Sequence, residues 1–354
     1  MRVFLANVPV PCGGGNTESG DTALLWKSRG VDVTVLYFEK CRCGKETIIP
    51  GEKNAWVPDG KNPWVRRLED AGVSFAPAES GRLDKVPGLA GSVVTGFCSS
   101  HLLHNWPEMS EIGCRVVWSP CMTYVGINEN EAFRKVPPNV VHFQSVYQQA
   151  TLEDEYRAFG CCSFRVVHGA FKPLDFNPRP AGERFVVGRL ARPNRTKWTP
   201  HLWKVIGEAR KECPGITALC QAWTDELSNH CGAPPDWAEC LPINKLSSQE
   251  FLDRCHAMIC PNWSVSENWP RVGLEAMSAG VPVIADNQGG WPEMLGDAGI
   301  LADTLGDYVP AIERLSDRER REELISLGAK RVAEIANPDP IADEWLEMFR
   351  DLGA

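Results

Sequence analysis

The segment from Glu267 to Glu293 constrains the fold of this chain more than any other stretch. It reads as a loop, a short helix with Pro270 at its first position, a helix end at Ala279-Gly280, and a buried apolar strand over 281–285. Gly289-Gly290 marks the turn after that strand. The unpaired N–H groups and partial positive charge at the start of a helix favour an anion, so the segment predicts an anion site.

Two glutamates flank this predicted anion site, with Glu267 just before the helix and Glu275 inside it. An ionised carboxylate accepts hydrogen bonds from sugar hydroxyls. Together with the runs AMSAGVPVIA and GGWPE, the Glu-x7-Glu spacing resembles the donor-sugar motif of retaining GT-B glycosyltransferases, the large group that includes bacterial mannosyltransferases and sucrose-synthase-like enzymes. A structural alternative is an ordinary helix-surface ion pair between Arg271 and Glu275, four residues apart.

The resemblance implies a fold of two doubly wound, Rossmann-like α/β domains that face each other across a ligand-binding cleft. We expect an acceptor-side domain over 1–177, a nucleotide-sugar-binding domain over 178–338, and a C-terminal helix over 339–354 that returns to the first domain. A chain of 354 residues, 43% hydrophobic and 23% charged, is long enough for two cores.

The N-terminal part alternates strands and helices in the way that opens a doubly wound domain. A strand over 3–8 leads into Gly13, Gly14 and Gly15, and a helix over 21–29 and a strand over 31–38 follow. Glycines between a strand and a helix let the backbone approach a ligand. The resemblance implies that this loop faces the donor diphosphate and the acceptor. Further strands are predicted over 92–97, 115–119 and 139–143.

The C-terminal part opens with a strand over 184–188, the triplet Gly188-Arg189-Leu190 and a basic loop. In the resembled family an arginine and a lysine at these places clasp the nucleotide diphosphate. Arg189 fits directly; because the loop is longer here, Lys197 is our choice for the lysine and Arg195 is its rival. The departing diphosphate gains negative charge, which fixed cations stabilise.

The resemblance also implies roles for the residues around the helix. Glu267 would lie against the donor sugar, either binding its hydroxyls or stabilising positive charge at the anomeric carbon, and Glu275 would hold the ribose hydroxyls. Backbone N–H groups near Arg271 and Val272 would meet phosphate or sugar. The predicted donor-binding set is completed by Asn268 and Trp269, the indole being a possible wall of the pocket.

No cofactor or metal is expected, since no Asp-x-Asp motif occurs and the cations of Arg189 and Lys197 can replace a divalent ion. One metal alternative is open: Cys98, His101 and His104 share a helix face, and Cys114 or Cys121 could add a ligand. Cys121 also stands near the place where related enzymes carry a histidine, and a thiol does not reproduce the hydrogen bonds of an imidazole. The remaining cysteines suit buried thiols.

Residues 40–67 are basic, rich in proline and glycine, and interleaved with Trp56 and Trp64. We predict a loop, which is either a solvated excursion or a surface for an anionic acceptor such as a phospholipid, a phospho-sugar or nucleic acid.

The resemblance implies transfer of a sugar, typically a hexose, from a nucleotide-sugar to an acceptor hydroxyl, with the anomeric configuration retained. The acceptor is open: a glycan, a lipid-linked or small molecule, or DNA. Three alternatives are a DNA-modifying glycosyltransferase acting on a hydroxymethylated base, a sugar-nucleotide 2-epimerase, and a non-catalytic nucleotide-sugar-binding protein. The net charge of −9 disfavours general coating of nucleic acid, although a local basic surface can override it.

No apolar run reaches membrane-spanning length, and the opening residues MRVFLANVPVP read as a strand rather than a leader. These features predict a location in the cytoplasm. The oligomeric state is left open.

Overall fold

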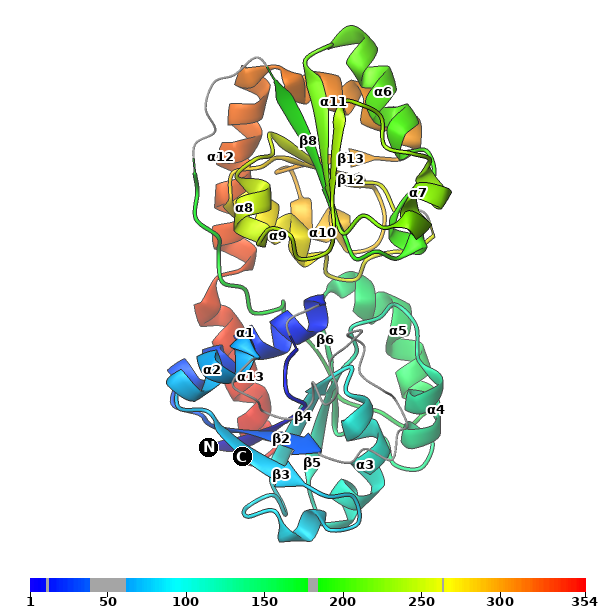
Figure 1. Ribbon diagram of the computed structural model, residues 1–354. Helices are drawn as coiled ribbons and strands as arrows, with labels where there is room; N and C mark the ends of the chain where they lie inside the picture. The colour runs from blue at the N-terminus through cyan, green and yellow to red at the C-terminus, as the bar shows by residue number, and fades with distance from the viewer. Residues whose placement is uncertain (11–12, 39–61, 178–183, 263) are drawn as a thin grey trace. The chain divides into compact units, whose positions relative to one another are not determined.

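The computed structural model of the protein describes residues 1–10, 13–38, 62–177, 184–262 and 264–354. The chain divides into two compact units: unit 1 is Met1–Phe171 with Ala336–Ala354, and unit 2 is Lys172–Ile335. Each unit is a Rossmann-like α/β domain built on one parallel sheet, as the sequence predicted (Figure 1).

The unit boundaries fall slightly earlier than 177 and 338, where the sequence placed them. Residues just before 177 are tied to unit 2 by hydrogen bonds: the Leu174 amide donates to Ser278 Oγ at 3.1 Å and the Asp175 amide donates to Gln249 Oε1 at 2.9 Å. Because of these hydrogen bonds, residues 172–177 belong to unit 2 rather than to unit 1.

The sheet of unit 1 has seven parallel strands in the order β3-β2-β1-β4-β5-β6-β7. The strands are β1 (Arg2–Ala6), β2 (Asp32–Phe38), β3 (Ser74–Ala78), β4 (Val93–Phe97), β5 (Arg115–Ser119), β6 (Val140–Phe143) and β7 (Phe164–Val166). The helices are α1 (Gly14–Ser28), α2 (Pro63–Asp70), η1 (Leu83–Lys85), α3 (Ser100–Glu111), α4 (Ile127–Phe133), α5 (Val146–Ala158) and α13 (Pro338–Asp351).

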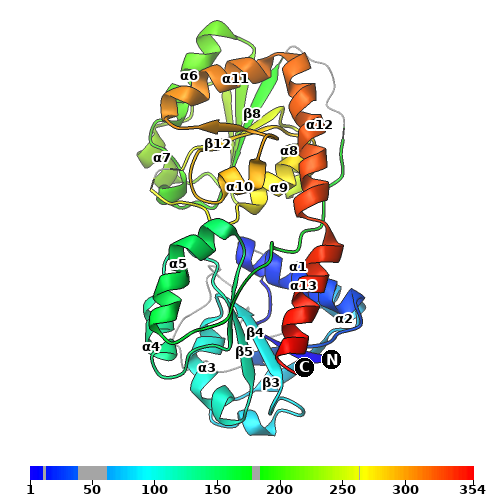
Figure 2. The ribbon, with the colours of Figure 1, turned by 180° about the vertical axis from the view of Figure 1, so that it is seen from behind.

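Two apolar layers cover this sheet, with α1, α2 and α13 on one face and α3, α4 and α5 on the other (Figure 1). The last helix, α13, starts at Pro338 behind the capping side chain of Asn337 and packs beside α1 (Figures 1 and 2). The ring centroids of Trp26 and Trp345 lie 4.9 Å apart in an edge-on contact. Residues more than three hundred positions apart therefore share one core.

The sheet of unit 2 has six parallel strands in the order β10-β9-β8-β11-β12-β13. The strands are β8 (Phe185–Leu190), β9 (Ile216–Gln221), β10 (Ala238–Leu241), β11 (Ala257–Cys260), β12 (Val283–Asp286) and β13 (Ile300–Ala302). The helices are η2 (Arg195–Lys197), α6 (Leu202–Glu212), α7 (Asp225–Cys231), α8 (Ser248–Leu252), α9 (Arg271–Ser278), α10 (Trp291–Leu295), η3 (Leu305–Asp307), α11 (Tyr308–Ser316) and α12 (Arg318–Ile335). Figure 2 shows α6 beside α11 and α12 beside α9.

Several local predictions are confirmed and others are wrong. The predicted strand over 115–119 is confirmed as β5. Helix α8 begins with a capping box, in which the Ser247 hydroxyl accepts from the Glu250 amide and the Glu250 carboxylate accepts from the Ser247 amide. By contrast, α1 begins at Gly14 rather than at 21, because Gly13 takes a positive φ of 88° and its carbonyl starts the helix. Strands β3 and β13 and helix α7 were not predicted.

The end of the predicted loop 40–67 is helical, so that part of the prediction is wrong. Asn62 caps α2 and Pro63 occupies its first turn. Trp64 is 6% exposed, and the Arg67 guanidinium lies 4.1 Å from its ring centroid. The indole packs in the fold and is not available to stack on a nucleobase. Residues 39–61, with Trp56, lie outside the described residues.

None of the helices in the described part of the chain is long and apolar enough to cross a membrane.

A fully buried histidine, His142, lies in β6. Its Nδ1 lies 2.9 Å from Ser119 Oγ and its Nε2 lies 2.8 Å from the Val167 carbonyl oxygen. Because a carbonyl oxygen only accepts, Nε2 carries the proton in the neutral ring. Burial lowers the pKa of His142 from 6.5 to about 4.

This shift predicts an acid-sensitive unit 1. The unfolded chain binds the proton at about pH 6.5 and the folded chain only at about pH 4, so the stability contributed by neutral His142 is lost as the pH falls through that window. The full effect is about 3 kcal/mol. Between pH 7 and 4.5, wild type should lose about 2–3 kcal/mol more unfolding free energy than His142→Gln in urea titrations. The exposed-site control His201→Gln should behave like wild type; equal pH slopes for wild type and His142→Gln would contradict the assignment.

Candidate active site

The site is built at the point of unit 2 where the strand order reverses. From β8 the chain runs to β9 and β10 on one side, and β11, β12 and β13 lie on the other. At such a switch point the loops after adjacent parallel strands separate and leave room for a ligand. The loops after β8 and β11 nevertheless contact each other at one point, where the Ser264 amide donates a hydrogen bond of 3.1 Å to the Thr196 carbonyl.

Two residues predicted from sequence, Lys197 and Glu267, meet across these loops. Lys197 Nζ donates to Glu267 Oε1 at 2.6 Å, and the side chains are 17% and 22% exposed. An ion pair of this kind contributes little net stability, since the Coulomb gain is offset by desolvation. The main consequence of the pair is that a cation and a carboxylate are held in fixed positions at the carboxyl ends of β8 and β11.

Arg189 stands behind this pair, within β8, which extends two residues beyond the predicted strand end at 188. Its side chain is 3% exposed and lies with its guanidinium carbon 5.3 Å from the centroid of the Trp198 ring. Nη2 donates to the Lys197 carbonyl oxygen and, at 3.1 Å, to Asn262 Oδ1. In this structure Arg189 therefore fixes the backbone that carries Lys197.

A series of hydrogen bonds, which the sequence did not indicate, connects Asn262 with Asp286 and Tyr308. The Asn262 amide donates to Asp286 Oδ2 at 2.8 Å, and Tyr308 Oη donates to Asp286 Oδ1 at 2.8 Å. Burial, followed by the charge of Asp286, raises the pKa of Tyr308 well above its usual value, so the hydroxyl keeps its proton and acts as the donor. Asn262 and Asp286 both stand at the carboxyl ends of strands, where a polar residue after an apolar run is a signal that could have found them.

The backbone of Glu267 rests on the Gly289-Gly290 turn. The Gly290 amide donates to the Glu267 carbonyl at 2.8 Å, and Gly289 has a φ of +65°. A Cβ on Gly290 would overlap the Asn268 carbonyl oxygen. The two glycines therefore allow the close approach that positions Glu267.

The remaining predicted donor-binding residues of unit 2 lie around the start of α9. Asn268, Trp269 and Arg271 are buried, and Val272 and Glu275 are half-buried. Pro270 precedes the helix as its cap instead of occupying its first position. The Arg271 amide donates to the Trp269 carbonyl at 2.9 Å, so this N–H is already used within the loop.

The glycine run lies in unit 1, where Gly13 caps α1 and Gly14 and Gly15 form its first turn. A Cβ on Gly15 would be 3.1 Å from Cys121 Sγ, so this turn packs directly on Cys121. The Cys121 amide donates to Cys98 Sγ at 2.8 Å. The hydrogen bond with Cys98 and burial raise the pKa of Cys121 well above its usual value, which keeps this thiol protonated.

The metal alternative does not hold for the part of the chain that the structure describes, where no group of three or more His, Cys, Asp or Glu side chains is arranged to bind a metal ion. His101 is buried and stacks on Phe38 at 5.4 Å between ring centroids. Burial lowers its pKa to about 4. His101 is thus a packed core residue. Every cysteine in the described ranges is a free thiol.

Part of unit 2 is similar in sequence to a known protein family. Residues 235–318, which include Glu267, Glu275 and the glycine turn, match the family model of glycosyl transferases group 1. This region of unit 2 is therefore similar in sequence to glycosyltransferases.

Two curated relatives agree with that match. The D-inositol 3-phosphate glycosyltransferase of Thermomonospora curvata is 33% identical over 90 residues, which are 24% of this chain and 21% of that protein. The alpha-maltose-1-phosphate synthase of Mycolicibacterium smegmatis is 31% identical over 127 residues, which are 33% of this chain and 32% of that protein. The matched region thus spans about a fifth and a third of these relatives.

The fold is similar over the whole length to that of Anabaena HepE, solved with UDP-glucose, with a TM-score of 0.70 and 16% identity over 99% of this chain and 100% of the other. The predicted GT-B fold class is therefore confirmed.

The Gly289-Gly290 turn generates a stability prediction. Gly290→Ala forces a methyl group into the Asn268 carbonyl and should lower the unfolding free energy of unit 2 by roughly 1–3 kcal/mol or more. The control is Gly207→Ala in α6, where a Cβ would be 3.8 Å from the Trp237 ring; this change should be neutral or stabilise the helix slightly. Urea unfolding measures both, and equal midpoints for the two variants would contradict the proposed close approach.

Proposed function

We propose that this protein is a glycosyltransferase that moves a sugar from a nucleotide-sugar to an acceptor hydroxyl, with its donor site at the Lys197–Glu267 pair. The observation that carries the proposal is the 2.6 Å contact between these two side chains at the switch point of the unit 2 sheet. The match of residues 235–318 to glycosyl transferases group 1 supports the same conclusion.

The pair offers opposite charges to two parts of one ligand. Lys197 would bind the donor diphosphate, where an ammonium group stabilises the charge that builds up as the diphosphate leaves. Glu267, released from Lys197, would face the donor sugar and accept hydrogen bonds from its hydroxyls or stabilise positive charge at the anomeric carbon. Glu275 would hold the ribose hydroxyls from α9.

The reaction breaks the bond between the anomeric carbon and the diphosphate oxygen and forms a bond to the acceptor oxygen. The departing nucleoside diphosphate carries away the electron pair of the broken bond and takes up the proton that the acceptor hydroxyl loses. Arg189 would act through the loop, because its guanidinium holds the Lys197 carbonyl. We propose that no divalent ion is needed, with cationic side chains in its place.

Retention of the anomeric configuration belongs to the same proposal. Its support is the Glu267-x7-Glu275 spacing, which resembles that of retaining enzymes. UDP-glucose is the first donor to test, because HepE, a protein of similar fold, was solved with it. Proton NMR of the product distinguishes an axial from an equatorial anomeric bond.

The DNA-modifying alternative loses one of its supports, because Trp64 is buried in unit 1. The 2-epimerase and the non-catalytic binding protein are separated from a transferase by product analysis with and without an acceptor. An epimerase releases a free epimer from donor alone, and a binding protein leaves the donor intact.

The roles of the pair predict different effects for its two members. Lys197→Met should lower kcat by about 10²–10³, the effect of losing one electrostatic stabiliser. Glu267→Gln should abolish turnover while UDP affinity is kept or increased, since Lys197 is no longer neutralised. Turnover assays and calorimetric titration with UDP measure the two effects.

The control is the pair Lys211–Glu208, which has the same 2.6 Å separation on the exposed surface of α6. Lys211→Met and Glu208→Gln should leave turnover and UDP affinity unchanged. Normal turnover in Glu267→Gln would show that Glu267 does not act in the reaction. It would also contradict the proposal that the donor binds at the Lys197–Glu267 pair.

A further inference from the structure

Two cysteines of unit 1 lie beside each other at the carboxyl ends of neighbouring strands. Cys98 directly follows β4, Cys121 comes two residues after β5, and the two strands pair in parallel up to Phe97 and Ser119. The Cys98 amide donates to the Ser119 carbonyl at 2.9 Å, and the Cys121 amide donates to Cys98 Sγ at 2.8 Å. The sheet therefore brings together two thiols that are 23 residues apart in the chain.

The two thiols differ in their access to solvent. Cys98 is exposed, whereas Cys121 is half-buried. Cys98 also has a φ of +47°, in the left-handed region that residues other than glycine seldom adopt. Strained backbone of this kind is found mainly at functional sites. A reagent from solvent therefore meets Cys98 first, with Cys121 behind it.

The backbone around Cys121 is held in place. Gln148 Nε2 donates to the carbonyls on either side of it, that of Pro120 at 2.7 Å and that of Met122 at 2.9 Å. The Cys98 side chain is the largest cause of the rise in the pKa of Cys121, which requires the two sulfur atoms to be close together. A fixed thiol next to an exposed one is the arrangement in which a disulfide closes without rebuilding the loops.

From this geometry we propose that Cys98 and Cys121 are a redox modification site, at which a small disulfide such as glutathione disulfide converts the two thiols into an intramolecular disulfide. The Cys98 thiolate attacks one sulfur of glutathione disulfide and releases the first glutathione. The Cys121 sulfur then attacks the Cys98 sulfur of the mixed disulfide, and the second glutathione leaves. Both protons of the protein thiols end on glutathione, so the protein is oxidised and glutathione disulfide is reduced.

The bond affects the glycine turn at the start of α1. A Cβ on Gly15 would be 3.1 Å from Cys121 Sγ, so this thiol packs directly on the turn. Forming the bond draws Cys121 Sγ to about 2.05 Å from Cys98 Sγ and changes this contact. The sequence predicts that Gly13–Gly15 face the donor diphosphate and the acceptor, and oxidation should therefore lower transfer activity. This effect rests on the proposed function, whereas the formation of the disulfide does not.

Oxidation of the full chain in a glutathione buffer tests the assignment, with tryptic mapping under non-reducing conditions as the measurement. The fragments 86–115, with Cys98, and 116–134, with Cys121, should be joined by a bond that dithiothreitol breaks. Cys98→Ser should abolish this link. Cys121→Ser should leave glutathione attached to Cys98, because the second thiol is missing. Cys162→Ser, which removes another exposed thiol, is the control and should form the link as wild type does.

Transfer assays measure the effect of the bond. The activity of wild type should fall in proportion to the fraction of linked chains and return with dithiothreitol. Cys98→Ser should keep the activity of its own reduced form throughout the same oxidation.

Three results would overturn the proposal: a link that persists in Cys98→Ser, glutathione that stays on Cys98 of wild type without a link to Cys121, or full transfer activity in linked wild type. The first would assign the link to Cys114, which lies in the same fragment. A failure of the proposed function has a different signature. The link would then form and break as expected in a chain that transfers no sugar in its reduced state either.

Discussion

The ion pair between Lys197 and Glu267 joins two loops that are seventy residues apart in the chain. It exists because β8 and β11 are neighbours in a parallel sheet, so their carboxyl ends meet at one edge. In the described residues of these loops the regular structure is limited to the 3₁₀ turn η2, and the loop after β8 is held from behind by Arg189. The site therefore depends on the buried Arg189, which anchors the partly buried Lys197.

The anchoring is layered. Tyr308 and Asp286 hold Asn262, Asn262 and Arg189 hold the loop after β8, and the Gly289-Gly290 turn supports Glu267 from the other side. Tyr308 and Arg189 are buried, whereas the Lys197 and Glu267 side chains are 17% and 22% exposed, so solvent screens the ion pair more than it screens these two supporting residues. Such support is what keeps charged groups in place without a bound ligand.

Sequence reasoning found the members of the site that belong to a continuous pattern. Glu267, Glu275 and the glycine turn lie within one stretch of 27 residues, and strand β5 was placed at its observed ends. It did not find Asp286 and Tyr308, because their contact depends on how helix α11 packs against strand β12, and no local spacing records that. It also ended the first strand of unit 2 at Gly188, one residue before Arg189, whereas pairing with β9 keeps β8 extended to Leu190.

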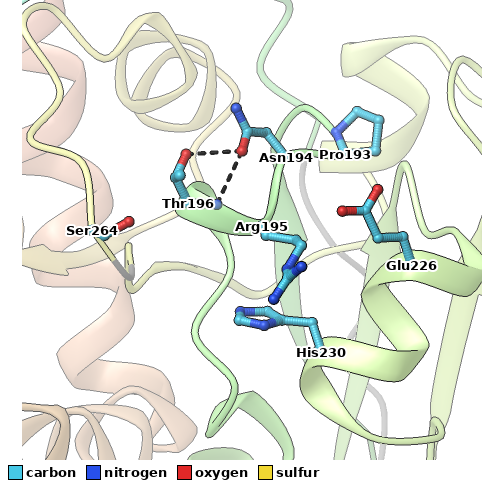
Figure 3. A pocket seen from close by; sticks show the side chains of 7 residues that line it. All are labelled: Pro193, Asn194, Arg195, Thr196, Glu226, His230 and Ser264. Atoms are coloured by element: carbon cyan, nitrogen blue, oxygen red, sulfur yellow. Dashed lines mark hydrogen bonds between the residues drawn. The ribbon is translucent and has the colours of Figure 1, made fainter.

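A pocket beside α7, lined among others by Arg195, Glu226 and His230, illustrates the same limit (Figure 3). Helix α7 was not predicted, so Glu226 and His230 gave no signal, and Arg195 entered only as a rival of Lys197 for the diphosphate. The structure separates the two cations: Lys197 is paired with Glu267, and Arg195 faces a different space. The loop that is longer than in the resembled family thus carries two cationic groups with different surroundings.

The most direct test of the central claim is a crystal structure with a nucleoside diphosphate bound. We expect phosphate oxygens within hydrogen-bond distance of Lys197 Nζ, with the contact between Lys197 and Glu267 broken and the hydrogen bond from Arg189 to the Lys197 carbonyl kept. A diphosphate bound elsewhere, with Lys197 and Glu267 still 2.6 Å apart, would contradict it.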